Sequence, residues 1–122
     1  MQKILNVGCG SKTHKLLDNI DLVSDDPIVK TYDIKNGLPY PDGTFDAVYH
    51  SQVLEHINYD MASNFIKECW RVLKPGGVIR IVVPDLEEIA REYLKKLESV
   101  LDNPSELEKA DYEWITIELI DQ

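Results

Sequence analysis

The chain has 122 residues, 43% of them hydrophobic and 29% charged, a profile that fits one globular domain with its own core. That composition excludes an intrinsically disordered chain, and 6 glycines and 2 cysteines exclude collagen-like and disulfide-framework classes. No apolar run approaches the roughly 20 residues of a membrane span, and the residues after Met1 do not form a secretory signal. Cys9 and Cys69 have no metal or redox spacing, which favours a reducing cytoplasm.

The net charge of −9 is concentrated toward the end of the chain. Residues 1–84 carry 9 basic and 10 acidic side chains, whereas residues 85–122 carry 4 basic and 12 acidic ones. An acidic chain without a basic stripe does not suit counterion-driven binding to nucleic acid phosphates. We therefore expect no nucleic acid partner, and we interpret the acidic tail as a solvated helix face.

Short apolar or β-branched segments predict five strands. In chain order, the predicted strands cover residues 4–7, 19–23, 28–34, 45–50 and 78–83. The first strand ends at the tight turn Gly8-Cys9-Gly10, and the turn signal Pro41-Asp42-Gly43 precedes the fourth.

Apolar residues at three- and four-residue steps predict helices over residues 60–73 and 86–101. We place Cys69 and Trp70 on the buried stripe of the first helix, which the following proline and glycines terminate. Asp85 is the expected N-cap of the second helix. Ser105 is the expected cap of a last helix that reaches toward Ile120.

Buried strands that alternate with helices in the second half predict an α/β fold with a doubly wound, mostly parallel sheet. Only about ten residues separate Gly10 from Asp21, so a full crossover helix does not fit between the first two strands. We therefore expect the early crossovers to be shortened to a turn or a loop.

The glycine loop and the acid on the second strand suggest a nucleoside ligand. Glycines after a strand let the backbone approach a ligand, and an acid such as Asp21 can accept both hydroxyls of a ribose. The dinucleotide fingerprint requires a third glycine where Thr13 stands, which disfavours NAD and an NAD-dependent oxidoreductase. A nucleoside cofactor without phosphates suits the loop better.

Further motifs occur in a fixed order along the chain. They are residues 5–10 (LNVGCG), 37–42 (GLPYPD), 45–49 (FDAVY), 53–57 (VLEHI) and 71–77 (RVLKPGG). In this order and spacing the sequence resembles the class I S-adenosylmethionine-dependent methyltransferases, in the branch of small bacterial and archaeal enzymes. The resemblance covers residues 4–94, about three quarters of the chain, and implies a Rossmann-like sheet with strand order 3-2-1-4-5.

The resemblance also assigns cofactor contacts. It implies that the loop at Gly8, Cys9 and Gly10 wraps the methionine part of S-adenosylmethionine, and that Asp21 binds the ribose with Leu22 beside the adenine. The remaining cofactor positions that it implies are Asn6, where many relatives carry an acid, Asp33 and Ile34 at the adenine, and His50 and Ser51 near the transferable methyl.

The sequence contains one candidate catalytic residue. His56, beside Glu55, follows the fourth strand, where acceptors approach in this fold, and is a candidate general base; the alternative is that it caps or packs. His50 and His56 have no third ligand nearby, so we expect no metal site. A sulfonium methyl is already activated, and its transfer requires alignment above all.

We therefore expect an enzyme that transfers a methyl group from S-adenosylmethionine to a small-molecule acceptor, such as a sugar or a lipid-linked precursor. The alternative is a non-catalytic cofactor-fold module for binding or interaction, which the shortened crossovers favour.

The last residues carry three further expectations. We assign residues 1–101 to the cofactor-binding domain and residues 102–122 to an acidic helical extension of it. The fifth strand would be a bare apolar edge, so we expect the last helix to fold over the sheet or to pair with its copy in a homodimer. We also expect the chain to be a truncated form of a longer enzyme.

Overall fold

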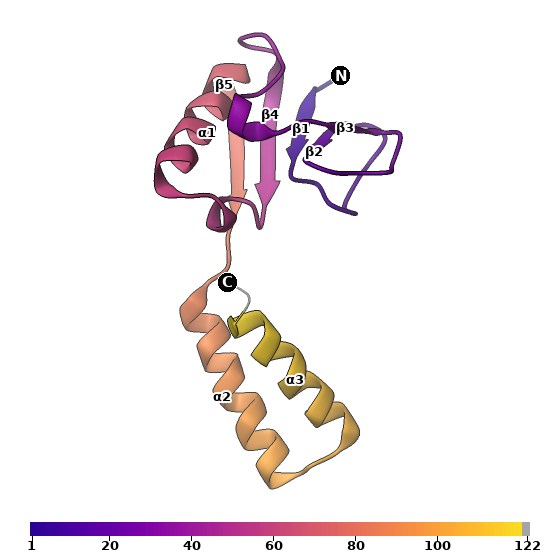
Figure 1. The fold of residues 1–122 in the computed structure, drawn as a ribbon, viewed down its shortest axis with the longest axis vertical. Helices are drawn as coiled ribbons and strands as arrows, with labels where there is room; N and C mark the ends of the chain where they lie inside the picture. Colours follow the sequence, from indigo (N-terminus) through magenta and orange to yellow (C-terminus); the bar gives the residue numbers. More distant parts are fainter. Residues whose placement is uncertain (121–122) are drawn as a thin grey trace. The chain divides into compact units, whose positions relative to one another are not determined.

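The computed structural model describes residues 1–120 and divides the chain into two compact units, Met1–Val83 and the residues from Pro84 onward (Figure 1). The predicted boundary lies after residue 101, whereas the two compact units divide after Val83. The observed division comes earlier because helix α2 (Leu86–Asp102) packs against helix α3 (Glu106–Ile120) and belongs to the same compact unit as that helix.

The first unit contains one five-stranded sheet. Its strands are β1 (Ile4–Val7), β2 (Asp18–Asp21), β3 (Val29–Thr31), β4 (Phe45–Ser51) and β5 (Leu73–Val82). The order is β3-β2-β1-β4-β5, and every neighbouring pair is parallel. The predicted Rossmann-like fold and strand order are therefore confirmed.

The early crossovers are short, as predicted. No helix lies between β1 and β2 or between β2 and β3. Both β2 and β3 end before their predicted limits. The third strand stops because the Asp33 side chain accepts a hydrogen bond from the Lys35 amide and caps a 3₁₀ turn, η1 (Ile34–Asn36).

Strand β5 begins earlier than predicted, directly at the end of helix α1 (Tyr59–Val72). Leu73 pairs with Phe45, but the next paired residue is Val78, opposite Ala47, so the intervening segment bulges out of the ladder. Pro75 has no N–H to donate and Gly76 adopts a φ of 79°, which are features of a β-bulge.

The core of the first unit lies between the sheet and α1. Buried Phe65, Cys69 and Val72 of the helix face the fully buried Phe45 and Val48 of β4. The expectation that Trp70 is buried was wrong, since its side chain is 79% exposed. One residue along an α-helix is a rotation of about 100°, which turns Trp70 away from the face that buries Cys69.

The second unit is a pair of helices whose predicted caps are confirmed. The Asp85 carboxylate accepts a hydrogen bond from the Glu88 amide, and the Ser105 hydroxyl accepts one from the Glu108 amide. The Tyr93 ring on α2 lies 5.6 Å from the Tyr112 ring on α3. Among residues 1–120, no helix has the length and apolar character needed to cross a membrane.

Candidate functional site

A cavity of about 450 Å³ lies where the carboxyl ends of β1, β2, β3 and β4 meet. Its lining residues are Gly8, Asp21, Leu22, Tyr32, Asp33, Ile34, Lys35, Gln52, Val53, His56 and Ile57. In a doubly wound sheet this is the edge where ligands bind, and the volume falls within the range of about 300–1,000 Å³ for ligand pockets. The structure thus brings together Gly8, Asp21, Leu22, Asp33, Ile34 and His56 of the predicted site.

Gly8 brings the backbone to the wall of the cavity. It adopts a φ of 63°, and its amide donates a hydrogen bond to the Ile20 carbonyl at 2.8 Å. A Cβ at this position would lie 2.4 Å from Cγ2 of Val53 on the opposite segment. Only glycine fits both the conformation and the space.

Asp21 holds the glycine loop against the end of β2. One carboxylate oxygen accepts a hydrogen bond from the Gly10 amide, and the other accepts one from the Leu22 amide, each at 2.6 Å. Each oxygen has two lone pairs, so both can still accept from a ligand hydroxyl. The oriented carboxylate at the cavity wall therefore fits a ribose diol.

Apolar and polar groups beyond β2 and β3 fit a nucleoside base. Leu22 is largely exposed, and Ile34 packs against the core from the start of η1. Asp33 is oriented by its bond to the Lys35 amide. Together they present one carboxylate and two apolar side chains toward the same cavity.

Asn6 and Cys9 do not line the cavity. The buried Asn6 amide donates hydrogen bonds to the Lys12 carbonyl and to the Asn19 side chain, at 2.9 and 3.1 Å. Asn6 thus supports the segment that follows the glycine loop. Burial and the charge of Asp21 raise the pKa of the Cys9 thiol, which keeps it protonated. Gly10 is exposed and bonds Asp21 through its amide.

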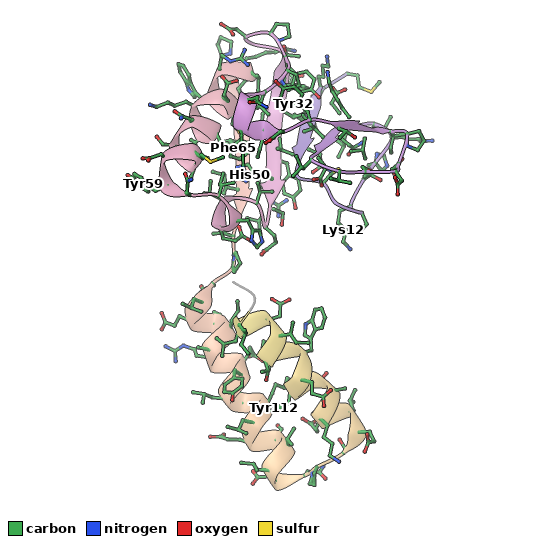
Figure 2. The ribbon with its side chains drawn as sticks, in the orientation of Figure 1. Lys12, Tyr32, His50, Tyr59, Phe65 and Tyr112 are labelled. Atoms are coloured by element: carbon green, nitrogen blue, oxygen red, sulfur yellow. The ribbon has the colours of Figure 1, made fainter. Side chains whose placement is uncertain are left out.

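His50 is fully buried. Figure 2 shows it on β4 next to Phe65 of α1, and the two rings lie 4.9 Å apart. Burial lowers the pKa of His50, and the nearby Glu55 carboxylate opposes that effect. Neither ring nitrogen has a hydrogen-bond partner among the described residues. Half-buried Ser51 ends β4, and neither it nor His50 lines the cavity.

His56 lies at the cavity wall in a 3₁₀ turn, η2 (Leu54–His56). Its side chain is 61% exposed, and its Nε2 lies 3.8 Å from Oε1 of Glu55. It is therefore accessible both to a ligand and to water. Within residues 1–120, no three His, Cys, Asp or Glu side chains are grouped so that they could hold a metal ion.

The sequence analysis did not assign several lining residues, namely Tyr32, Lys35, Gln52, Val53 and Ile57. Val53 and Ile57 belong to the motif that contains His56, so their proximity to a ligand could have been inferred from that motif. Gln52 has no such signal. Gln52 adopts a left-handed φ of 59°, and its backbone amide donates a hydrogen bond to the Val82 carbonyl. Left-handed backbone conformations of residues other than glycine concentrate at ligand sites.

Comparison with known proteins agrees with this geometry. A family profile described as "Methyltransferase domain" matches residues 5–81. A protein of Mycolicibacterium smegmatis named "Probable S-adenosylmethionine-dependent methyltransferase" is 46% identical over 57 residues, which cover 43% of this chain and 21% of that protein. Demethylmenaquinone methyltransferase of Staphylococcus haemolyticus is 30% identical over 113 residues, which cover 87% of this chain and 43% of that protein.

The chain is also similar to the crystal structure of the [4+2]-cyclase SpnF, with a TM-score of 0.54, 25% identity, and coverage of 66% of this chain and 38% of that one. The chain spans less than half the length of each of these three proteins. The family profile nevertheless covers most of the chain and includes the whole glycine loop and the His56 motif. The chain therefore belongs to the methyltransferase domain family and is of the class I type, for which S-adenosylmethionine is the cofactor.

Proposed function

We propose that this protein transfers a methyl group from S-adenosylmethionine to a small-molecule acceptor. The observation that carries the proposal is the cavity at the ends of β1, β2, β3 and β4, which is lined by a close-approach glycine and an oriented carboxylate. The name of one relative, demethylmenaquinone methyltransferase, specifies a small-molecule acceptor, which favours that class here.

Different residues of the cavity would contact different parts of the cofactor. Gly8 would lie along the methionine part, Asp21 would accept the ribose hydroxyls, and Leu22, Asp33 and Ile34 would enclose the adenine. When bound, the cofactor supplies a methyl group on a sulfonium, which is already activated for displacement. The contribution of the protein is to align the acceptor with the methyl group.

His56 is the candidate general base. It lines the cavity from the segment after β4. A hydroxyl acceptor has to lose its proton as it attacks, and an imidazole is the side chain best matched to that task near neutral pH. Sugars and lipid-linked precursors carry such hydroxyls, so we propose them as the first acceptor classes to test.

Calorimetry with S-adenosylhomocysteine tests the cofactor site. Asp21→Ala should weaken binding by about 1.5–3 kcal/mol, the range for hydrogen bonds to a charged group. Asp25→Ala removes the same charge from an exposed position on the following loop and should leave affinity unchanged. Equal affinity of the Asp21 variant and the wild type would remove Asp21 from the site, and a preference for NAD would refute the cofactor.

Incubation with labelled S-adenosylmethionine and a metabolite extract tests the transfer itself. A labelled small molecule would support the proposal, and His56→Ala should then reduce the label strongly while it leaves cofactor affinity intact. Tight cofactor binding with no transfer to any acceptor would instead favour a binding module. The fold does not exclude that outcome, since the similar SpnF structure is named as a cyclase.

We also propose that two chains associate as a homodimer. Strand β5 is an edge strand of the sheet, and it carries the exposed apolar side chains Val78, Ile79 and Ile81. An apolar edge with unpaired backbone groups is a template for association. Light scattering at several concentrations should show a mass that rises toward twice the chain mass, and a constant monomer mass would refute the proposal.

The cysteines support the proposal of a reducing, cytoplasmic location. Cys9 and Cys69 are both free and buried. Burial, with the charge of Glu68, raises the pKa of Cys69 to about 12, so this thiol stays protonated and unreactive. Fractionation of the native cells should recover the protein in the cytoplasm with both thiols reduced, and recovery as a disulfide-linked species would contradict this location.

A further inference from the structure

The side chains of Glu55 and His50 do not line the cavity, yet their polar atoms are buried at an energetic cost. Both carboxylate oxygens of Glu55 and both ring nitrogens of His50 are shielded from solvent and lack hydrogen-bond partners among the described residues. Burial of a charge or of a polar group without a partner destabilises a fold. Such a pair next to a ligand cavity is a candidate for a functional role.

The position of Glu55 links the interior of the unit to the cavity. On one side it acts electrostatically on the buried His50 of β4. On the other side, its Oε1 lies 3.8 Å from Nε2 of His56, which lines the cavity. Glu55 itself does not line the cavity, so it can act on a ligand only through His56.

We propose that Glu55 is a positioning residue for His56: its carboxylate accepts the Nε2–H of the ring and so leaves Nδ1 as the lone pair that faces the acceptor. This inference rests on the proposed methyl transfer. The distance of 3.8 Å is longer than a hydrogen bond, and a small rotation of the exposed His56 ring in solution would shorten it. A carboxylate behind an imidazole fixes the tautomer and stabilises the protonated ring.

The proposed step moves one proton to His56 and one methyl group to the acceptor. The acceptor X–H bond breaks, its electron pair stays on X and forms the bond to the methyl group, and the proton moves to Nδ1 of His56. The bond between the methyl group and the sulfonium breaks with its electron pair on sulfur, which leaves as the neutral thioether. The imidazolium that results carries its charge next to the Glu55 carboxylate. Because the His56 side chain is 61% exposed, it can then release the proton to water. His50 makes no hydrogen bond to Glu55, and the two groups interact only electrostatically.

NMR of ¹⁵N-histidine-labelled full chain tests the tautomer without any cofactor. His14 provides an internal standard, because its Nδ1 accepts a hydrogen bond from the Leu16 amide, which places the proton of the neutral ring on Nε2. The spectra are recorded at about pH 8.5, well above the ordinary pKa of an imidazole. The ¹⁵N chemical shifts of Nδ1 and Nε2 of His56 should then be as widely separated as those of His14. A His56 proton on Nδ1 in the wild type would overturn the proposal, whatever the variants do.

Two substitutions separate positioning from a merely structural role. Glu55→Leu should narrow the His56 shift separation toward that of a free, averaging imidazole, whereas Glu55→Gln keeps an acceptor oxygen and should preserve it. Glu87→Gln, an exposed partner of Arg91, is the control for the loss of charge. Since leucine replaces a buried carboxylate without hydrogen-bond partners, we expect Glu55→Leu to fold at least as stably as the wild type.

The kinetic arm distinguishes this inference from the proposed function. Once an acceptor is identified, Glu55→Leu should lower kcat about 10- to 100-fold and leave the affinity for S-adenosylhomocysteine within twofold of the wild type. Glu55→Gln should have a kcat between those of Glu55→Leu and the wild type. An unchanged tautomer and an unchanged kcat would refute the role of Glu55 while methyl transfer stands. Absence of cofactor binding in the wild type would refute the proposed function, and the NMR result would still be measured.

Discussion

Substitution of Gly8 by alanine should damage the site in two separable ways. The first is conformational, because the φ of 63° lies in the left-handed region, where an L-residue with a Cβ costs about 1–2 kcal/mol. The second is steric, because the new Cβ would lie 2.4 Å from Cγ2 of Val53. Val53 is β-branched and has few alternative rotamers, so relief requires backbone movement, which typically costs about 1–3 kcal/mol.

Gly10 provides the matched control. It has a φ of 51°, and an added Cβ there would meet no atom within 4 Å. Gly10→Ala should therefore show the conformational cost alone, about 1–2 kcal/mol, whereas Gly8→Ala should lose about 2–5 kcal/mol in total. The double variant Gly8→Ala/Val53→Ala removes the clash and should recover the steric part, less the cost of the lost valine methyl groups.

Urea unfolding followed by tryptophan fluorescence and circular dichroism measures these differences, and calorimetry with S-adenosylhomocysteine measures their effect on the cavity. We expect the affinity of Gly8→Ala to fall more than that of Gly10→Ala, since Gly8 lines the cavity and Gly10 does not. If Gly8→Ala were as stable as Gly10→Ala, and the double variant brought no recovery, the close approach of Gly8 and Val53 would be refuted.

Three further predictions concern the stability of the two compact units. Arg71→Ala should destabilise the first unit by about 2–4 kcal/mol in urea, because its guanidinium donates to Glu68, to Asp42 and to the Tyr40 and Leu38 carbonyls, and all of these bonds would be lost. Arg91→Ala removes only an exposed pair and should cost less than about 1 kcal/mol, so equal losses would contradict the reasoning. Burial lowers the pKa of His50, so below about pH 6.5 the imidazole is protonated more readily in the unfolded chain than in the folded one. The free energy of unfolding should therefore decrease as the pH falls, by at most about 1.4 kcal/mol per pH unit. If a His50→Phe variant lost stability equally steeply over the same pH range, His50 would be excluded as the cause. Asp85→Ala should lower the stability of α2 by about 1 kcal/mol through loss of its cap, seen as reduced helicity on mild heating.

Local patterns in the sequence determined most of the elements. The β-branched run from Val78, the glycines after Val7 and the helical spacing of Phe65 and Cys69 each reflect a short-range preference. The first strand and the helix therefore occur where predicted, and the fifth strand includes most of its predicted segment. The caps at Asp85 and Ser105 are equally local, because each bond joins residues three apart. The ordered motifs were enough to indicate the family and its cofactor.

Only the tertiary structure decided which of the motif residues share the cavity. Asn6, Cys9 and His50 stand at positions that the resemblance assigns to the cofactor, yet the fold turns these side chains into the interior. Tyr32 and Gln52 line the cavity without any sequence signal. The reason is that the direction of a side chain at the end of a strand depends on the backbone conformation of the loop that follows. That conformation is set by the packing of segments that are distant in the sequence. The approach of Val53 to Gly8 arises in the same way, from chain segments that meet only once β1 and β4 are paired. Glu55 and His56 are neighbours in the sequence, but only the fold decides that the Glu55 carboxylate is shielded from solvent while the His56 ring is exposed.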